Sequence, residues 1–122
     1  MAVNLNKAQA LHAFWNSFGW PAYDETTVPD NAELPYITYP VEVGEWGYPC
    51  LIRASLWYRG TSWQEITDKA EEITGGLNGK GIPYDNGTIL IFNSDPKYQR
   101  IQESDDSIRR IVMNIYMEFL EI

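Results

Sequence analysis

The hydrophobic and polar positions of residues 51–59 alternate strictly, and the rest of the chain can be placed against this stretch. One side carries Ile52, Ala54, Leu56 and Tyr58. The other side carries Arg53, Ser55, Trp57 and Arg59. A period of two residues predicts a strand with one buried face.

Residues 62–77 follow with the period of an amphipathic helix. Its apolar positions are Trp63, Ile66, Ala70, Ile73 and Leu77. Ser62 and Glu65 match a capping box, in which each side chain binds a free amide of the first turn. Gly75 and Gly76 then end the helix, because glycine readily adopts the backbone conformation of a helix end. The sequence therefore predicts a strand, a tight turn and a helix.

Three further strands are predicted from the same kind of pattern. Residues 36–46 alternate around Pro40, which lacks an amide donor, so we expect an edge or bulged strand in a hairpin with residues 51–59. Residues 88–93 are apolar on both faces, which predicts a short central strand. Residues 108–122 form a long strand, with one apolar row made of Ile111, Met113, Ile115, Met117 and Phe119.

A first helix is predicted at residues 5–18, capped by Asn4 or Asn6. Its apolar stripe consists of Ala8, Leu11, Phe14, Trp15 and Phe18. Turn-forming and acidic residues predict surface loops at 20–35, 78–87 and 94–106. The predicted fold is α+β, in one domain of residues 1–122. Two helices pack on a mostly antiparallel four-stranded sheet, in the order α-β-β-α-β-β.

The charge balance argues against two classes of partner. Nine Lys and Arg face 17 Asp and Glu, a formal charge of -8, which disfavours a general nucleic-acid binder or a protein of anionic membrane surfaces.

Cys50 is the single cysteine, so neither an intrachain disulfide nor a thiolate zinc cluster can form. We expect no signal peptide and no membrane span, because no apolar run approaches about 18 residues.

Candidate catalytic groups are few. Cys50 and His12, each the only one of its kind, could form a nucleophilic pair, but a small buried thiol and a helix-surface imidazole explain them more simply. Many carboxylates are present, yet none match the pairing of a glycosidase or the spacing of a calcium loop. The glycines between Gly75 and Gly81 close a helix, whereas those of a phosphate loop open one. We therefore expect no enzyme, cofactor or metal.

Aromatic residues are abundant, with five Trp, eight Tyr and four Phe, and such side chains are favoured at protein interfaces. The basic pair Arg109 and Arg110 makes ion pairs either across a subunit boundary or locally on the surface. We select as candidate self-assembly residues Trp46, Tyr48, Trp57, Arg59, Arg109 and Arg110.

The order of these segments resembles that of the tail-terminator proteins of long-tailed bacteriophages, which also join head to tail and include small proteins called minor capsid proteins. The resemblance covers nearly the whole chain. It is carried by FGWPAY, LPYITYPV, LIRASLWYRGTSWQEITDKAEEI, GTILIF and PKYQRIQESDDSIRRIVMNIYMEFLEI. In that family a polar segment with Gln and Asp leads into a long final strand, as residues 99–122 do here.

The resemblance implies a structural protein of the virion without catalytic activity, assembled in the cytoplasm of the bacterial host. It implies a ring, commonly of six copies, which caps the tail tube and offers a surface to the head connector. DNA would pass through the ring without specific binding.

Two other functions remain open. The charge of -8 also suits an acidic module that mimics DNA or inhibits a nucleic-acid enzyme, although the carboxylates concentrate in loops. A carbohydrate binder would use Trp20, Trp46 and Tyr48 as stacking platforms, but two predicted helices argue against it.

Overall fold

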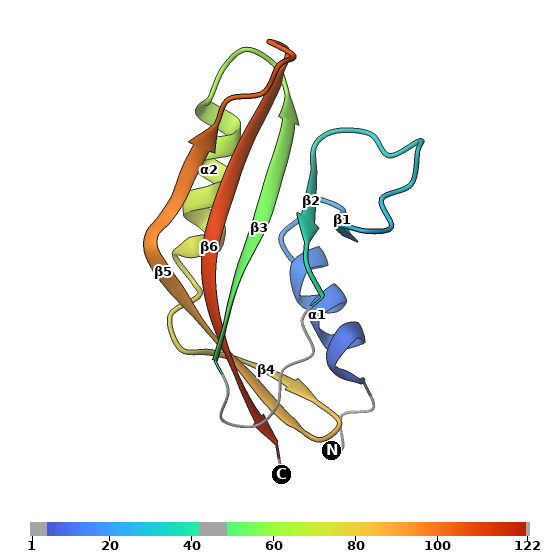
Figure 1. Cartoon of the computed structure of the whole chain (residues 1–122), viewed down its shortest axis with the longest axis vertical. Coiled ribbons are helices and arrows are strands. Elements are labelled where there is room, and N and C mark those ends of the chain that lie inside the picture. The colour runs from blue at the N-terminus through green and yellow to red at the C-terminus, as the bar shows by residue number, and fades with distance from the viewer. Residues whose placement is uncertain (1–4, 42–48, 122) are drawn as a thin grey trace.

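The computed structural model describes residues 5–41 and 49–121 of the chain, drawn in Figure 1. Two helices and six strands are present in these ranges. In chain order they are α1 (Lys7–Asn16), β1 (Ala22–Asp24), β2 (Tyr36–Tyr39), β3 (Pro49–Arg59), α2 (Gln64–Thr74), β4 (Lys80–Tyr84), β5 (Gly87–Ile101) and β6 (Ile108–Glu121).

All six strands belong to one sheet, in the order β1-β2-β3-β6-β5-β4. β1 runs parallel to β2, and every other pairing in this sheet is antiparallel. The three long strands β3, β6 and β5 curve along their length, so the sheet curls like a half-barrel (Figure 1). Both helices contribute to the one core cluster, so they pack on the same, inner face of the sheet.

The predicted fold class is therefore wrong. The sheet has six strands and mixed direction, and the element order is α-β-β-β-α-β-β-β, whereas we expected a mostly antiparallel sheet of four strands in the order α-β-β-α-β-β. The two missed strands lie inside predicted loops. β1 has three residues and β4 carries a glycine and a proline, so neither shows the alternation on which the prediction depended.

The segment predicted as a loop at residues 94–106 is also partly strand. β5 continues to Ile101, and its register against β6 shifts between Asn93 and Tyr98. This bulge absorbs Asp95 and Pro96, the residues that indicated a loop, and regular pairing resumes beyond it. A strand interrupted by a bulge loses its sequence period, which explains the error.

The predicted pairing of residues 36–46 with residues 51–59 is confirmed over a short stretch. Tyr36, Ile37 and Thr38 pair antiparallel with Trp57, Leu56 and Ser55. β2 ends at Tyr39, directly before Pro40. The remaining predicted strand positions, 42–46, lie outside the described residues.

The two helix starts differ from each other in how they are capped. At α1, the Asn6 side chain accepts from the Gln9 amide at 2.9 Å and the Gln9 side chain accepts from the Asn6 amide at 3.0 Å, so a cap at Asn6 is confirmed. At α2, the predicted capping box is wrong. The Ser62 hydroxyl accepts from the Gln64 amide at 3.1 Å, but Glu65 instead hydrogen-bonds to Tyr58 and raises the pKa of that phenol.

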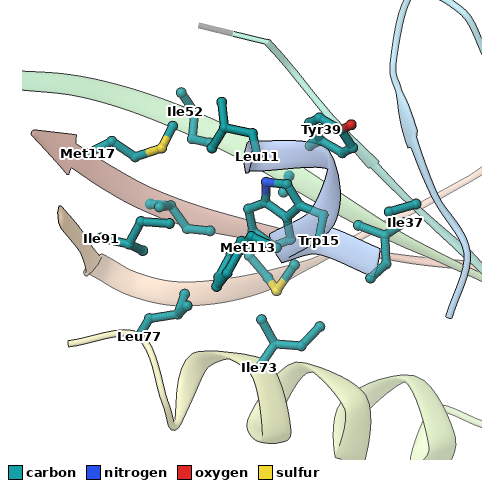
Figure 2. Packing of buried hydrophobic residues seen from close by; sticks show 14 of the residues in the cluster. Leu11, Trp15, Ile37, Tyr39, Ile52, Ile73, Leu77, Ile91, Met113 and Met117 are labelled. Carbon is teal, nitrogen blue, oxygen red and sulfur yellow. The ribbon is translucent and has the colours of Figure 1, made fainter. Parts of the chain in front are cut away.

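The core lies between the inner face of the sheet and the two helices (Figure 2). The predicted apolar row of β6 is confirmed, because every member is fully buried: Ile111, Met113, Ile115, Met117 and Phe119. Trp15 of α1 is also fully buried and stacks on Tyr39 of β2 with 6.1 Å between ring centroids. α2 contributes Ile66, Ala70 and Ile73 to the same core.

Candidate functional site

Strand register divides the side chains of the sheet between two different faces. Residues paired with the core row of β6 point toward the helices, and their sequence neighbours point the other way. We call this second side the open face, because both helices lie on the opposite side (Figure 1). It carries Tyr36 and Thr38 of β2, Leu51, Arg53, Ser55, Trp57 and Arg59 of β3, Ile108, Arg110, Val112, Asn114, Tyr116, Glu118 and Leu120 of β6, and Thr88, Leu90, Phe92, Gln99 and Ile101 of β5.

One half of the open face is organised around Trp57. Its indole Nε1 donates to the Thr38 hydroxyl at 2.9 Å, and the Arg110 guanidinium lies 4.6 Å from the ring centroid. Arg110 also donates to the Ser55 hydroxyl from Nε and Nη2, at 3.2 and 3.1 Å, and its Nη1 lies 3.4 Å from a Glu103 carboxylate oxygen. These contacts hold the indole in one orientation, which is the property of a preorganised binding platform.

The other half of the open face is apolar. Leu51 is 73% exposed and is paired in register with Tyr116. The Tyr116 ring meets Phe92 of β5 edge-on, with 6.0 Å between centroids. Leu90 and Leu120 lie on the same face further along these strands. An exposed leucine beside paired aromatic rings is typical of a surface that binds another protein.

Two hollows open on this side of the sheet. The first, of about 370 Å³, lies where β5 bulges and is bordered by Arg53, Asp95, Gln99 and Asn114. The Asn114 amide donates to the Pro96 carbonyl at 2.9 Å and so fixes one wall of this hollow. The second, of about 290 Å³, lies beside Trp57 and is lined by Tyr36, Arg59 and Ile108, with Leu34 from the loop before β2.

The strand positions of the open face carry more basic than acidic side chains, and further carboxylates lie beside them: Asp95 borders the first hollow, and Glu103 and Asp105 border the second. The strand positions include three arginines, Arg53, Arg59 and Arg110, and one carboxylate, Glu118. Between Lys7 and Arg53 the chain contains no Lys or Arg, but it contains six Asp and Glu. Arg53, Arg59 and Arg110 therefore share a face with Trp57, and Arg and Trp are the residues that most often dominate binding energy at interfaces.

The predicted self-assembly residues divide between the two faces. Trp57, Arg59 and Arg110 lie together on the open face. Arg109 lies on the helix side, where its guanidinium is 5.2 Å from the Trp63 ring centroid and donates to the Thr61 carbonyl at 2.9 Å. Trp46 and Tyr48 are outside the described residues. Adjacent residues of a strand point to opposite faces, so Arg109 and Arg110 cannot act as one basic pair.

The sequence prediction missed part of the open face, namely Tyr36, Leu51, Arg53 and Tyr116. Each of these residues alternates with a buried neighbour, so the period of two contained the signal. The sequence pattern does not show which face of the sheet the helices cover. In the structure both helices cover the other face.

The remaining candidate residues, His12 and Trp20, lie on the helix side of the sheet. His12 Nδ1 lies 2.9 Å from the Tyr39 hydroxyl, and burial together with the Asp24 charge raises the pKa of Tyr39. Trp20 stacks on Tyr58 with 6.3 Å between centroids. These contacts join α1, and the turn after it, to the sheet, and they do not converge on a reacting position.

The described residues contain neither a cluster of metal-ligating side chains nor a membrane-spanning helix. In residues 5–41 and 49–121, no three His, Cys, Asp or Glu side chains gather as a metal site. Neither described helix has the length and hydrophobicity needed to cross a membrane.

Comparison with known proteins gave no relative. No protein-family model, curated protein or solved structure matches the chain.

Proposed function

We propose that this chain is a structural tail-terminator protein of a long-tailed bacteriophage, which assembles as a ring, of six copies by the family resemblance, on the end of the tail tube. It would act at the head–tail junction of the virion, between the tail tube and the head connector. The resemblance of its segments to that family motivates the proposal. The observation that carries it is the open face, where arginines and aromatic rings lie on the side of the sheet away from both helices.

The open face leaves groups suited to binding uncovered in a single copy. A sheet in a domain of this size is usually covered on one face and solvated on the other, and its solvated face is mainly polar. Here the solvated face contains a stacked Trp57–Arg110 pair, an exposed Leu51 and the Phe92–Tyr116 pair. Burial of such groups against another protein stabilises an assembly, in addition to what their contacts within one copy contribute.

The net charge suits a ring through which DNA passes. A lumen lined by carboxylates repels phosphates, so a chain with a charge of -8 would not hold the genome during its exit. A ring is also the closed form of head-to-tail contacts, in which two different surfaces of each copy meet.

Electron microscopy of the purified chain, alone and mixed with tail tubes of the phage that encodes it, tests this proposal. We expect rings or caps at one end of the tubes, and tubes of fixed length when the chain is present during tube growth. Tubes that grow to the same lengths with and without the chain, and that carry no cap, would contradict the proposal. Bovine serum albumin, also acidic, serves as the control for non-specific binding.

A further inference from the structure

We propose that the open face binds the acidic loop between β1 and β2 of a second copy, through charge pairing with Arg53 and Arg59. This inference rests on the proposed self-assembly and specifies the two surfaces that meet. The contact is head-to-tail, because the face of one copy receives the loop of the next.

The loop carries an unbalanced negative charge. Glu25, Asp30 and Glu33 are exposed, and none of them takes part in the three ion pairs of the described residues. The nearest cations along the chain are Lys7 and Arg53, so the segment has no basic residue of its own. In Figure 1 the loop lies beyond the side of the sheet formed by β1 and β2. Its residues Ala32 and Leu34 border the hollow beside Trp57 of the same copy, and Glu25 and Asp30 are not among the residues that line that hollow.

The open face carries the matching positive charge. Arg53 and Arg59 are both exposed, and neither takes part in an ion pair of the described residues. Arg59 donates to the Ser107 hydroxyl at 3.2 Å. Hydrogen bonds from Ser107 are the main cause of the lowered pKa of Asp105, and the Arg59 charge is a lesser one. Arg110 is already paired with Glu103. Arg53 is therefore the arginine of this face that is most available to a carboxylate from outside.

The dimensions of loop and face agree. A loop of ten residues, 26–35, that runs out and back reaches at most about 17 Å, because an extended residue spans at most about 3.4 Å. Neighbouring strands lie about 4.8 Å apart, so such a loop can cross β3, β6 and the bulge of β5 in a neighbouring copy. The hollow of about 370 Å³ beside Arg53 lies within this distance.

Pairing of strand edges is a poorer route to assembly. At β1, the Ala22 amide donates to Asn16 Oδ1 at 3.0 Å and the Ala22 carbonyl accepts from Asn16 Nδ2 at 3.3 Å, so a side chain already occupies that edge. β4 contains Pro83, and β5 carries Pro96 and Lys97 at its bulge, features that oppose the addition of another strand. The faces and loops remain as the contact surfaces.

Charge reversal with rescue tests the contact in the full chain. The face variant carries Arg53→Glu and Arg59→Glu, and the loop variant carries Asp30→Lys and Glu33→Lys. Sedimentation velocity up to about 0.5 mM protein detects even contacts with millimolar Kd. We expect each variant alone to weaken self-association by about tenfold, the combination to recover to within about threefold of wild type, and 0.5 M NaCl to weaken the wild type.

Two matched controls keep the test specific. Lys80→Glu changes an exposed cation on the helix side of the sheet, and Asp68→Lys changes an exposed carboxylate of α2. Both are expected to associate as the wild type does. All the substituted side chains are exposed, so folding should be preserved, which circular dichroism checks.

Several results would overturn the inference. They are a wild type that stays monomeric throughout, variants that associate normally, and a combination that is not rescued. Equal weakening by Asp68→Lys would instead assign α2 as the occupant of the face. If the wild type binds single-stranded DNA and the face variant does not, while both self-associate equally, the face would be assigned to nucleic acid.

The two proposals can fail separately. If the charge variants still cap tail tubes as the wild type does, the tail-terminator function stands and this contact is wrong. If oligomers form by charge pairing but ignore tail tubes, the contact stands and the function is wrong.

Discussion

The two faces of the sheet have different roles, although they are built from the same strands. On β6, Met113 is fully buried against the helices, whereas Val112 beside it points to the open face. Val112 is only 4% exposed, but it does not belong to the core cluster. It is covered by neighbouring side chains of the open face. The covered face holds the fold together, and the open face has a second, thinner layer of packing that leaves Leu51 and Arg53 exposed. The difference separates residues that stabilise the copy from residues that are available to a partner.

The largest expected effect is on the covered face. Trp15→Ala should lower the free energy of unfolding by about 4 kcal/mol, because a fully buried indole leaves a cavity and Tyr39 loses its stacking partner. Urea unfolding followed by circular dichroism measures the change. A loss under about 1 kcal/mol would show that α1 contributes little to the core.

A smaller loss is expected for the matched tryptophan of the open face. Trp57→Ala removes the bond to Thr38 and the stacking of Arg110, which together should cost about 1–2 kcal/mol. The same unfolding assay applies. Trp57→Phe, which keeps a ring beneath Arg110, should recover about half of the loss, and an equal loss in both variants would contradict the stacking.

The covered face should also respond to alkaline pH. Four phenols on that side have raised pKa values: burial is the first cause for Tyr39 and Tyr84, and hydrogen bonds to Glu65 and Glu71 are the first causes for Tyr58 and Tyr98. The fold therefore favours the neutral phenol. This stabilisation is fully present below pH 10, the ordinary tyrosine pKa, and is lost as pH rises through the higher folded values.

Urea midpoints measured at pH 8, 10 and 11 test this dependence, and they should fall above pH 10. Tyr98→Phe removes the 2.7 Å hydrogen bond to Glu71 and should make the fall shallower. Leu51→Ser, which removes no titratable group from an exposed position of the open face, is the control and should leave the slope unchanged. A midpoint that rises with pH would reverse the sign and refute the assignment.

The smallest effect on stability is expected at Leu51. Leu51→Ser changes a side chain that is 73% exposed, so the free energy of unfolding should change by less than about 0.5 kcal/mol. Self-association measured by sedimentation should nevertheless weaken. A variant that associates as the wild type does would exclude the apolar half of the open face from the interface.

Much of the local structure followed from the sequence. The period of two fixed the buried row of β6, from Ile111 to Phe119, and the inner side of β3, because a strand repeats its environment every second residue. The helical stripes of α1 and α2 were predictable for the same kind of reason, except that on α1 the buried alanine is Ala10 and the predicted Ala8 is exposed. Asn6 could be named as one of two caps, since its partner Gln9 lies only three residues away.

Only the tertiary structure decided the strand count and the location of the candidate face. β1 and β4 are strands because β2 and β5 supply their hydrogen-bond partners, and three residues such as Ala22–Asp24 carry no period of their own. Likewise, the alternation around Trp57 shows that β3 has two sides but not which neighbour covers each side. Periodicity is a property of consecutive residues, whereas the cover over a face comes from segments far away in the chain, so the sequence determined the two sides and the fold determined which one was left open.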